Sequence, residues 1–450
     1  KLRKIYIKNK NKEVLIPSSL RFYRKKDKNN IMFGAIIENL KKEKIGYNLL
    51  YYDQPGSFDE FKKILKFLNC KNKYIGDYYS LDIFLKNRKA FKKIRNIWNN
   101  IKIDKDFRKS LDYKGIDIYD LSLQRFDFVF NSFLYLVVDN LNITKKILEK
   151  EKLSIILLDH DNTFYGKGLM MNLKDSNKIK TIALQYEPVS PSCNHTHIKD
   201  PEALDKKSVS WRPLPTIKCI WAPYHKKILL EYCNYVPSLI KITGNPKFDN
   251  LINKKFNSAE TFRKYNLDKN KKIVLFPTEL DLNILKIILK SFRNLDDAFL
   301  IIKPHPFEDM SVLRDTYNQL KSKNTMLLGK SANMYELVNI SSLIITRGST
   351  VGLEAMIKGI PVVLINPYKY KFSRIPLFDT NAVIVTKNKK ELSENIRKIL
   401  YDKKTKDIIK NNIKKFVFEQ AYKQDGKATE RIINIIKMLL KDDNIKRSNK

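Results

Sequence analysis

The sequence predicts an α/β fold with two Rossmann-like, doubly wound domains that face a cleft, and with helical additions in the N-terminal half. Two patterns predict it: the chain opens with strand, helix and strand, and strands alternate with amphipathic helices from Lys271 onward. A chain of 450 residues, 43% of them hydrophobic, is long enough for two or three domains with packed cores. We expect an N-terminal domain at residues 1–243 and a C-terminal domain at residues 244–450.

Short apolar runs predict the strands of the N-terminal half. Residues 13–19 and 47–53 are the first two, and the helical spacing of residues 31–42 between them implies a parallel sheet. Residues 57–150 carry helical patterns rich in Lys, Phe and Tyr, which predicts a helical insert in the N-terminal domain. The remaining strands are expected at residues 154–158, 180–185, 217–222 and 239–243.

The C-terminal half alternates more regularly. Amphipathic helices separate the apolar runs, which is typical of a doubly wound domain with about six strands. Those strands are expected at residues 273–276, 299–302, 326–328, 343–346, 362–365 and 383–385. Residues 389–441 have helical patterns and would close the chain.

The net charge of +39 is extreme, although much of the excess is Lys interleaved with Asn and Ile as a compositional bias. The positive charge that this bias does not explain favours anionic surroundings such as a membrane surface, a lipid-linked phosphate or nucleic acid. The basic residues are dispersed and no recognition module is visible, which argues against nucleic acid. None of the four cysteines forms a Cys-x-x-Cys pair, and no apolar run is long enough to span a membrane. We expect a cytoplasmic protein, with peripheral attachment at the inner face of the membrane left open.

Two motifs follow buried strands and would lie at one edge of the C-terminal sheet. Lys303 and His305 follow the run at residues 299–302, while Arg347, Ser349 and Thr350 follow the run at residues 343–346. In an open α/β sheet, ligands bind at the carboxyl ends of the strands. A cation, an imidazole, hydroxyls and a helix N-terminus suit a phosphate or diphosphate. The sequence therefore predicts that a nucleotide-linked donor substrate binds here, which makes the C-terminal half the nucleotide-binding domain. His305 would also have a catalytic role.

Five more residues are candidates for the donor site. Glu354 lies one turn into the helix after Thr350 and could accept hydrogen bonds from ribose hydroxyls; the alternative is an exposed helix carboxylate. Gly244 and Asn245 follow one expected strand, and Thr278 and Glu279 follow another. For these four, ordinary turn chemistry is the competing interpretation.

Two carboxylates of the N-terminal half, the expected acceptor side, are candidates for the general base that would deprotonate an acceptor hydroxyl. Asp161 ends an Asp-His-Asp stretch after an expected strand, and Glu187 follows the next strand. The Asp-x-Asp spacing resembles a metal motif, but a metal would need further oxygen ligands that the sequence does not supply. We therefore expect no metal and no cofactor.

The C-terminal motifs support a resemblance to known enzymes. They are Gly244-Asn245-Pro246, Lys303-Pro304-His305-Pro306, Gly348-Ser349-Thr350 with Glu354-Ala355, and Gly359-Ile360-Pro361-Val362. With them the chain resembles GT-B glycosyltransferases of the bacterial surface-polysaccharide group. That group includes sialyl- and polysialyltransferases, Kdo transferases and CDP-glycerol glycerophosphotransferases. UDP-GlcNAc 2-epimerases share the fold. The resemblance covers about residues 240–390 and is weak before residue 150.

The resemblance implies roles for three residues. In sialyltransferases and their relatives a His-Pro motif and a Ser/Thr pair contact the donor phosphate, and His305, Ser349 and Thr350 match them. The Gln-His-Gly turn of the epimerases is Gln185-Tyr186-Glu187 here, and their double-glycine turn is absent. Both departures favour transfer over epimerisation.

The first expectation is a metal-independent glycosyltransferase. It would move a sugar from a CMP-, CDP- or UDP-linked donor to a surface polysaccharide or another glycan acceptor, which could be polyprenyl-phosphate-linked. The alternatives are a CDP-glycerol or polyol-phosphate transferase and an enzyme like the UDP-GlcNAc 2-epimerases. A nucleic-acid-binding protein is a remote alternative.

Overall fold

The computed structural model describes residues 14–20, 23–24, 29–30, 32–53, 73–176, 178–191, 201–293, 295–369 and 375–448. The chain divides into two compact units. Unit 1 consists of Lys1–Tyr186, Lys199–Lys218 and Ile433–Lys450, and unit 2 consists of Glu187–Ile198 and Cys219–Ile432. The domain boundary at residue 244 expected from the sequence stays a prediction.

A seven-stranded sheet follows the order β11-β10-β9-β8-β1-β4-β5. The pairs that β1 makes with β4 and β8 are parallel, as are the pairs β4–β5 and β8–β9. The strands are β1 Val14–Ser18, β4 Tyr47–Tyr51, β5 Lys73–Tyr74, β8 Ile155–Leu158, β9 Lys180–Leu184, β10 Ile217–Ile220 and β11 Ile240–Ile242. Strands β1 and β8 are buried along their whole length, as parallel strands covered on both faces must be. All the strands expected between residues 13 and 243 are present.

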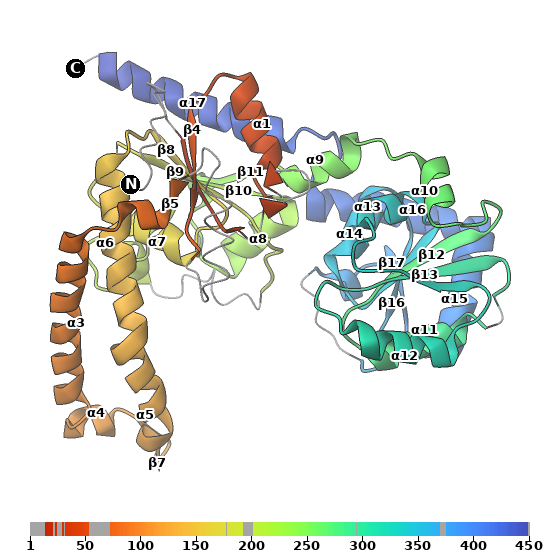
Figure 1. The fold of residues 1–450 in the computed structure, drawn as a ribbon, viewed down its shortest axis with the longest axis horizontal. Helices are drawn as coiled ribbons and strands as arrows, with labels where there is room; N and C mark the ends of the chain where they lie inside the picture. The colour runs from red at the N-terminus through yellow and green to blue at the C-terminus, as the bar shows by residue number, and fades with distance from the viewer. Residues whose placement is uncertain are drawn as a thin grey trace, which may run out of the picture. The chain divides into compact units, whose positions relative to one another are not determined.

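Two short helices pack beside this sheet, and a long helical hairpin projects away from it (Figure 1). The two are α1 Gly34–Lys42 and α7 Phe164–Met171. The hairpin consists of α3 Leu81–Ile101, α4 Lys105–Lys109, the two-residue strands β6 Asp112–Tyr113 and β7 Ile116–Asp117, α5 Tyr119–Phe128, a π-helical turn Val129–Phe133 and α6 Leu134–Lys150. The helical patterns expected over residues 57–150 are confirmed from Leu81; residues 54–72 lie outside the described part of the chain.

The second sheet has six strands in the order β14-β13-β12-β15-β16-β17, and every pair in it is parallel. In chain order this is third, second, first, fourth, fifth and sixth, the order of a Rossmann fold. The strands are β12 Lys272–Pro277, β13 Ala298–Lys303, β14 Thr325–Leu327, β15 Leu343–Thr346, β16 Val362–Ile365 and β17 Val383–Thr386. The order reverses between β12 and β15, and ligands of such sheets bind beyond the strands at that point.

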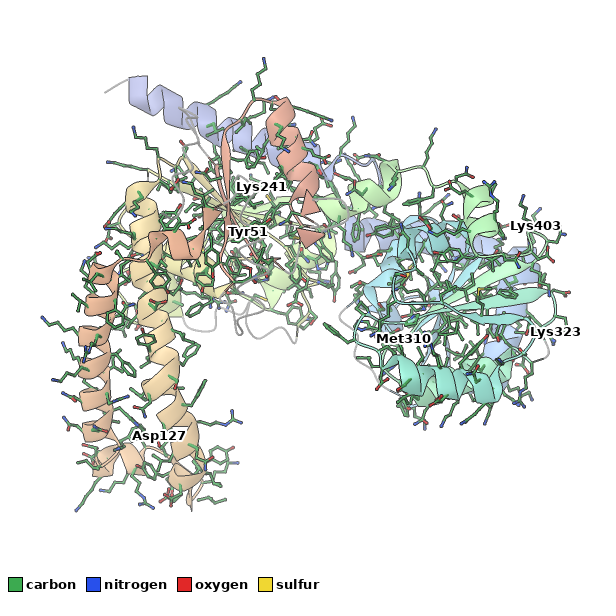
Figure 2. The ribbon with its side chains drawn as sticks, viewed as in Figure 1. Tyr51, Asp127, Lys241, Met310, Lys323 and Lys403 are labelled. Carbon is green, nitrogen blue, oxygen red and sulfur yellow. The ribbon has the colours of Figure 1, made fainter. Side chains whose placement is uncertain are left out.

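Helices surround the second sheet and bury their apolar sides in one continuous core (Figure 2). Most begin at an Asn, Asp or Ser whose side chain accepts from a free backbone N–H, as in α9, α11, α13 and α14. The helices of unit 2 are α8 Pro223–Glu231, α9 Pro246–Asn253, α10 Ser258–Lys264, α11 Leu282–Ser291, α12 Met310–Leu320, α13 Met334–Ile340, α14 Thr350–Ile357, α15 Lys389–Tyr401 and α16 Lys403–Ala421, together with the start of α17 Ala428–Ser448. The helical patterns expected over residues 389–441 are confirmed by α15, α16 and α17. No described helix has the length and apolar character needed to cross a membrane.

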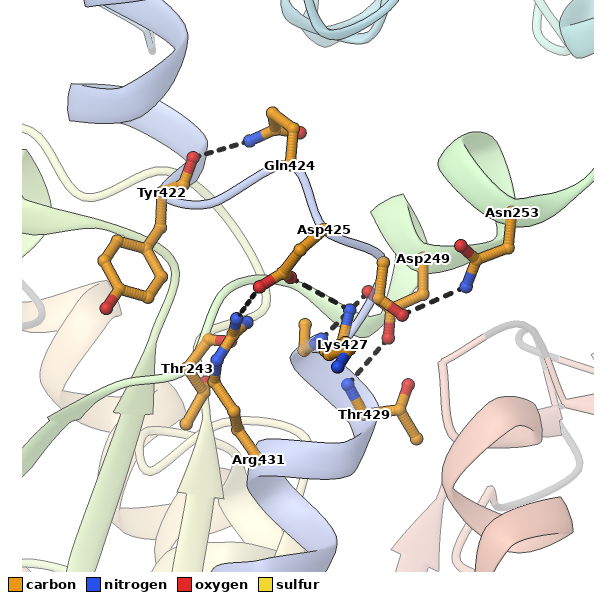
Figure 3. A network of polar contacts seen from close by, with 11 residues as sticks. Thr243, Asp249, Asn253, Tyr422, Gln424, Asp425, Lys427, Thr429 and Arg431 are labelled. Atoms are coloured by element: carbon orange, nitrogen blue, oxygen red, sulfur yellow. Dashed lines mark hydrogen bonds and ion pairs between the residues drawn. The ribbon is translucent and has the colours of Figure 1, made fainter.

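A polar network fixes the start of α17 against α9 (Figure 3). The carboxylate of Asp249 accepts from the backbone N–H groups of Ala428 at 3.0 Å and Thr429 at 2.7 Å. The guanidinium of Arg431 donates to the carbonyl of Thr243 at 3.1 Å. Gly244, with φ of +83°, lies so close that an added Cβ would be 3.0 Å from the Cβ of Ala428. Glycine is therefore required at this turn both for its backbone angle and for space.

Candidate active site

The ends of three neighbouring strands bring most of the predicted donor-site residues to one edge of the second sheet. Thr278 and Glu279 follow β12, and His305 comes two residues after β13. The residues from Arg347 to Thr350 follow β15. Strands β12 and β13 pair in register up to Pro277 and Lys303, so their polar ends lie level. This edge is the point where the strand order reverses.

Thr278 fixes the loop that carries His305. Its hydroxyl donates to the carboxylate of Glu308 at 2.6 Å and accepts from the backbone N–H of His305 at 2.8 Å. Its own N–H donates to the carbonyl of Lys303 at 2.9 Å. Thr278 and Glu308 are both buried. The loop therefore has a defined conformation before any ligand binds.

The imidazole of His305 is oriented by its own loop. Its Nδ1 accepts from the backbone N–H of Phe307 at 3.2 Å, which leaves the proton of the neutral ring on Nε2. Within the described residues no hydrogen bond or ion pair involves Nε2. The ring is partly exposed. Nε2–H is thus available to donate to an anionic oxygen.

Lys303 places a desolvated cation at the end of β13. Its side chain is buried, and burial lowers the pKa of its ammonium below the ordinary value. Nζ donates to the carbonyl of Pro304 at 2.9 Å, and no carboxylate of the described chain lies within ion-pair distance of it. A buried ammonium with only a carbonyl partner gains strongly from a nearby anion.

The N-terminus of α14 presents unused donors. Ser349 caps the helix by accepting from the N–H of Val351 at 3.4 Å, and the N–H groups of Gly348 and Ser349 donate to the hydroxyl of Thr346 at 3.2 and 3.0 Å. The backbone N–H and hydroxyl of Thr350 make no hydrogen bond within the described chain. Free N–H groups at a helix start attract phosphate oxygens.

Glu279 and Arg347 support this edge. The half-buried Glu279 accepts through its carboxylate from the hydroxyl of Thr346 at 2.5 Å and from the N–H of Arg347 at 2.8 Å. Burial raises its pKa, and these two bonds and the nearby guanidinium of Arg347 partly offset that effect. The guanidinium of Arg347 lies 3.4 Å from a carboxylate oxygen of Asp281. Glu279 therefore ties the end of β12 to the end of β15.

Glu354 and Asn245 are connected through Lys247. Asn245 caps α9 by accepting from the N–H of Lys247 at 3.0 Å, and Nζ of Lys247 lies 2.5 Å from the carboxylate of Glu354. Glu354 is 3% exposed, so the alternative of an exposed helix carboxylate is wrong. The ion pair ties the helix after Gly244 to α14.

The two candidate bases have different surroundings. Asp161 is buried, and its carboxylate lies 2.5 Å from Nζ of Lys218 and 3.1 Å from Nδ1 of His160. Lys218, in β10, is 1% exposed, so this pair is isolated from solvent. Glu187 is half-buried in the loop after β9. Asp161 belongs to unit 1 and Glu187 to unit 2.

His225, in α8, supports the loop that carries Glu187. Its Nδ1 accepts from the N–H of Val189 at 3.4 Å and its Nε2 donates to the carbonyl of Gln420 at 3.3 Å. Burial lowers the pKa of His225 to about 4, so the ring is neutral in this bridge.

Sequence reasoning missed Lys218, His225 and Glu308. Only Lys218 had a visible signal, since a lone Lys in an apolar strand requires a buried carboxylate partner. No group of three or more His, Cys, Asp or Glu side chains arranged to hold a metal occurs among the described residues. The expectation of a metal-independent reaction stays a prediction.

Comparison with known proteins decides the family. The sequence model of the CDP-glycerol:poly(glycerophosphate) glycerophosphotransferase family matches residues 81–438, well over half of the chain. The chain belongs to this family. No curated protein matches it.

Solved structures similar to this glycerophosphotransferase-family chain show its fold. A putative UDP-N-acetylglucosamine 2-epimerase from Listeria monocytogenes is 13% identical, with a TM-score of 0.58 over 96% of this chain and 97% of the other. The UDP-GlcNAc 2-epimerase from Neisseria meningitidis bound to UDP-GlcNAc is 14% identical, with a TM-score of 0.57 over 94% and 99%. The wall teichoic acid polymerase TagF is 13% identical, with a TM-score of 0.51 over 96% and 89%.

Family and fold together confirm the resemblance to the GT-B surface-polysaccharide group. The two parallel sheets confirm the Rossmann-like α/β fold. The protein is a transferase of this family that takes a nucleotide-linked donor.

Proposed function

We propose that the protein transfers glycerol phosphate, or another polyol phosphate, from a CDP-linked donor to a hydroxyl of a surface-polymer acceptor. One observation carries the proposal: Lys303, His305 and Thr350 lie at the ends of neighbouring strands where the sheet order reverses, and each keeps a donor that no described residue uses. Membership of the glycerophosphotransferase family moves the proposal from the sugar donor first expected to a glycerol phosphate donor.

In the proposed reaction the acceptor hydroxyl oxygen attacks the phosphorus next to glycerol in the donor diphosphate. A new P–O bond forms as the bond from that phosphorus to the bridging oxygen breaks, and CMP leaves with the electron pair. The ammonium of Lys303, Nε2–H of His305 and the start of α14 would stabilise charge on the leaving phosphate. These groups supply positive charge without a metal ion.

The acceptor proton needs a base, and Glu187 suits this role better than Asp161. The carboxylate of Asp161 is engaged with the buried ammonium of Lys218, so protonating it would break a buried pair. Glu187 is partly exposed in a loop held by His225. The acceptor in this proposal is a surface polymer or its polyprenyl-phosphate-linked precursor, which places the enzyme at the cytoplasmic side of the cell envelope.

The test is product analysis with the full chain. CDP-glycerol carrying labelled glycerol is incubated with a glycerol-phosphate primer, and CMP release and label in the polymer are both measured. Parallel reactions use UDP-GlcNAc and a CMP-linked sugar. The proposal expects CMP release with label incorporation, and it expects both to fall about 10²-fold in Lys303→Ala and in His305→Ala. Sugar incorporation instead would return the function to glycosyl transfer, and no turnover of any donor would refute a transferase acting at this site.

A further inference from the structure

Leu280, in the loop after β12, has a backbone conformation that leucine rarely adopts. Its φ is +60°, in the left-handed region where a Cβ is crowded and glycine is favoured. The side chain is 56% exposed and is not part of the hydrophobic core of unit 2, although Leu282 packs against that core. The fold therefore gains nothing from a leucine here that a glycine would not give. Strain of this kind collects at functional sites.

The other described residues with positive φ differ from Leu280. Apart from the glycines, two are asparagines, three are lysines and one is Tyr422. Asparagine visits the left-handed region readily, because its short polar side chain bonds locally. Tyr422 ends α16, and its ring packs against the core of unit 2. Leu280 is thus the one large apolar side chain of this set that faces solvent.

Two carboxylates hold the backbone on either side of Leu280. Glu279 accepts from the backbone N–H of Arg347 at 2.8 Å. Asp281 caps α11 by accepting from the N–H of Asn283 at 3.0 Å, and its carboxylate lies 3.4 Å from the guanidinium of Arg347. Both chain neighbours of Leu280 therefore contact Arg347, which lies just before the start of α14.

The loop that carries Leu280 lies between the two sets of donors at the candidate active site. Strand β12 is flanked by β13, which leads to His305, and by β15, which leads to the start of α14. A diphosphate held by both sets must cross the end of β12. Thr278 is buried there and Glu279 is half-buried, so Leu280 is the exposed side chain of this loop beside such a ligand.

We propose that Leu280 covers the reacting end of the bound donor. Its side chain lies against the carbon atoms of the polyol and keeps water away from the phosphorus that is transferred. The ribose is assigned to Glu354 on α14, so the polyol carbons are the apolar atoms at the other end of the diphosphate. The inference rests on the proposed function, and it adds the residue that favours transfer over hydrolysis.

The reaction that Leu280 suppresses is hydrolysis of the donor. In that reaction a water oxygen forms the new P–O bond in place of the acceptor hydroxyl, and the bond from phosphorus to the bridging oxygen breaks. CMP leaves with the electron pair, polyol phosphate is the second product, and the proton lost by water passes to the solvent. An apolar cover excludes the competing water and carries no group that could itself attack phosphorus.

The experiment measures label incorporated per CMP released, using the full chain, CDP-glycerol with labelled glycerol and a glycerol-phosphate primer. Leu280→Gly removes the side chain and the strain, so this ratio is expected to fall about tenfold while the urea midpoint stays the same or rises. Leu280→Met keeps an apolar side chain of similar volume and is expected to retain the wild-type ratio. Lys44→Gly is the matched control, because Lys44 has a φ of +57°, is exposed and belongs to unit 1.

Ligand binding separates contact with the polyol from contact with the nucleotide. Thermal stabilisation by CMP, which lacks the polyol, is expected to be equal in wild type and Leu280→Gly, whereas stabilisation by CDP-glycerol is expected to be smaller in the variant. A wild-type ratio in Leu280→Gly would overturn the inference alone, as would a large fall in its urea midpoint, which would assign Leu280 to the fold. A wild type that releases no CMP from CDP-glycerol would instead refute the proposed function, and this inference with it.

Discussion

The hydroxyl of Thr278 joins His305 to a buried carboxylate. It accepts from the backbone N–H of His305 at 2.8 Å and donates to Glu308 at 2.6 Å. One hydroxyl therefore determines where the imidazole lies and also satisfies Glu308. Because Thr278 directly follows β12, it holds the His305 loop from the neighbouring strand of the sheet.

Replacing that hydroxyl should affect stability and turnover together. Thr278→Val leaves Glu308 without its donor and frees the His305 loop, so we expect the free energy of unfolding to fall by about 1–3 kcal/mol. The value of kcat/KM should fall about tenfold, the effect of losing one positioning hydrogen bond. Urea denaturation and CMP release measure the two effects. Thr278→Ser is the control and should restore both; a valine variant with normal turnover would remove Thr278 from the site.

His305 itself should matter for turnover and not for folding. Its Nε2–H has no partner in the described chain, so His305→Ala loses little stability but about 10²-fold in kcat, the usual cost of one transition-state donor. Phe307→Leu is the control, because it keeps the backbone N–H that orients the ring. A normal kcat for His305→Ala, measured with CDP-glycerol, would exclude the imidazole from the reaction.

Substitutions should distinguish the two candidate bases, Asp161 and Glu187, by their effects on stability and on turnover. Asp161→Asn removes the carboxylate that lies 2.5 Å from the buried ammonium of Lys218, so the free energy of unfolding should drop by about 3–5 kcal/mol. Adding Lys218→Met should recover much of that loss, because both charges are then gone. Glu187→Gln should lower kcat about 10²-fold if Glu187 is the base. Full activity of Glu187→Gln would return the role to another group.

His225 should make the protein less stable in mild acid. Its folded pKa of about 4 lies below the ordinary value of 6.5, so the unfolded chain binds a proton in this window and the folded chain does not. Stability is complete above pH 6.5 and is lost as the pH falls toward 4, by about 2 kcal/mol between pH 7.5 and 5. His225→Gln keeps a donor and an acceptor and should flatten this part of the urea-midpoint profile. An unchanged slope would mean that another group causes the acid sensitivity.

The pair of Lys247 and Glu354 gives a test of ribose binding. Lys247→Ala should cost about 1 kcal/mol of stability, since the Lys247 side chain is 42% exposed and its interaction is screened. If ribose hydroxyls bind Glu354, they compete with Lys247, and the thermal stabilisation by CMP should be larger in Lys247→Ala than in wild type. The same stabilisation in both proteins would show that the ribose lies elsewhere.

Sequence patterns predicted the strands well because buried parallel strands are short apolar runs that end in polar residues. Lys303, His305 and Thr350 could be placed at one edge for that reason, since each follows such a run. The two-residue strand β5 and the π-helical turn in the hairpin have no periodic signal and were not expected.

The side-chain pairings could not be predicted. Glu279 meets Thr346 across 67 residues, and Lys247 meets Glu354 across 107. These partners depend on how two helices or strands pack, and no local pattern encodes that packing. For the same reason the position of Glu354 in its helix was equally compatible with an exposed and with a buried carboxylate.

Helix α17 has a consequence for the order in which the chain can fold during synthesis. The helix starts in unit 2, where Asp249 caps it, and from Ile433 onward it belongs to unit 1. Unit 2 is therefore complete once residue 432 has left the ribosome, although most of unit 1 is made first. Unit 1 must wait with part of its apolar surface uncovered until its last segment arrives. A stalled or truncated chain would thus contain a finished unit 2 beside an unfinished unit 1, and the unfinished unit is where chaperones and proteases would act.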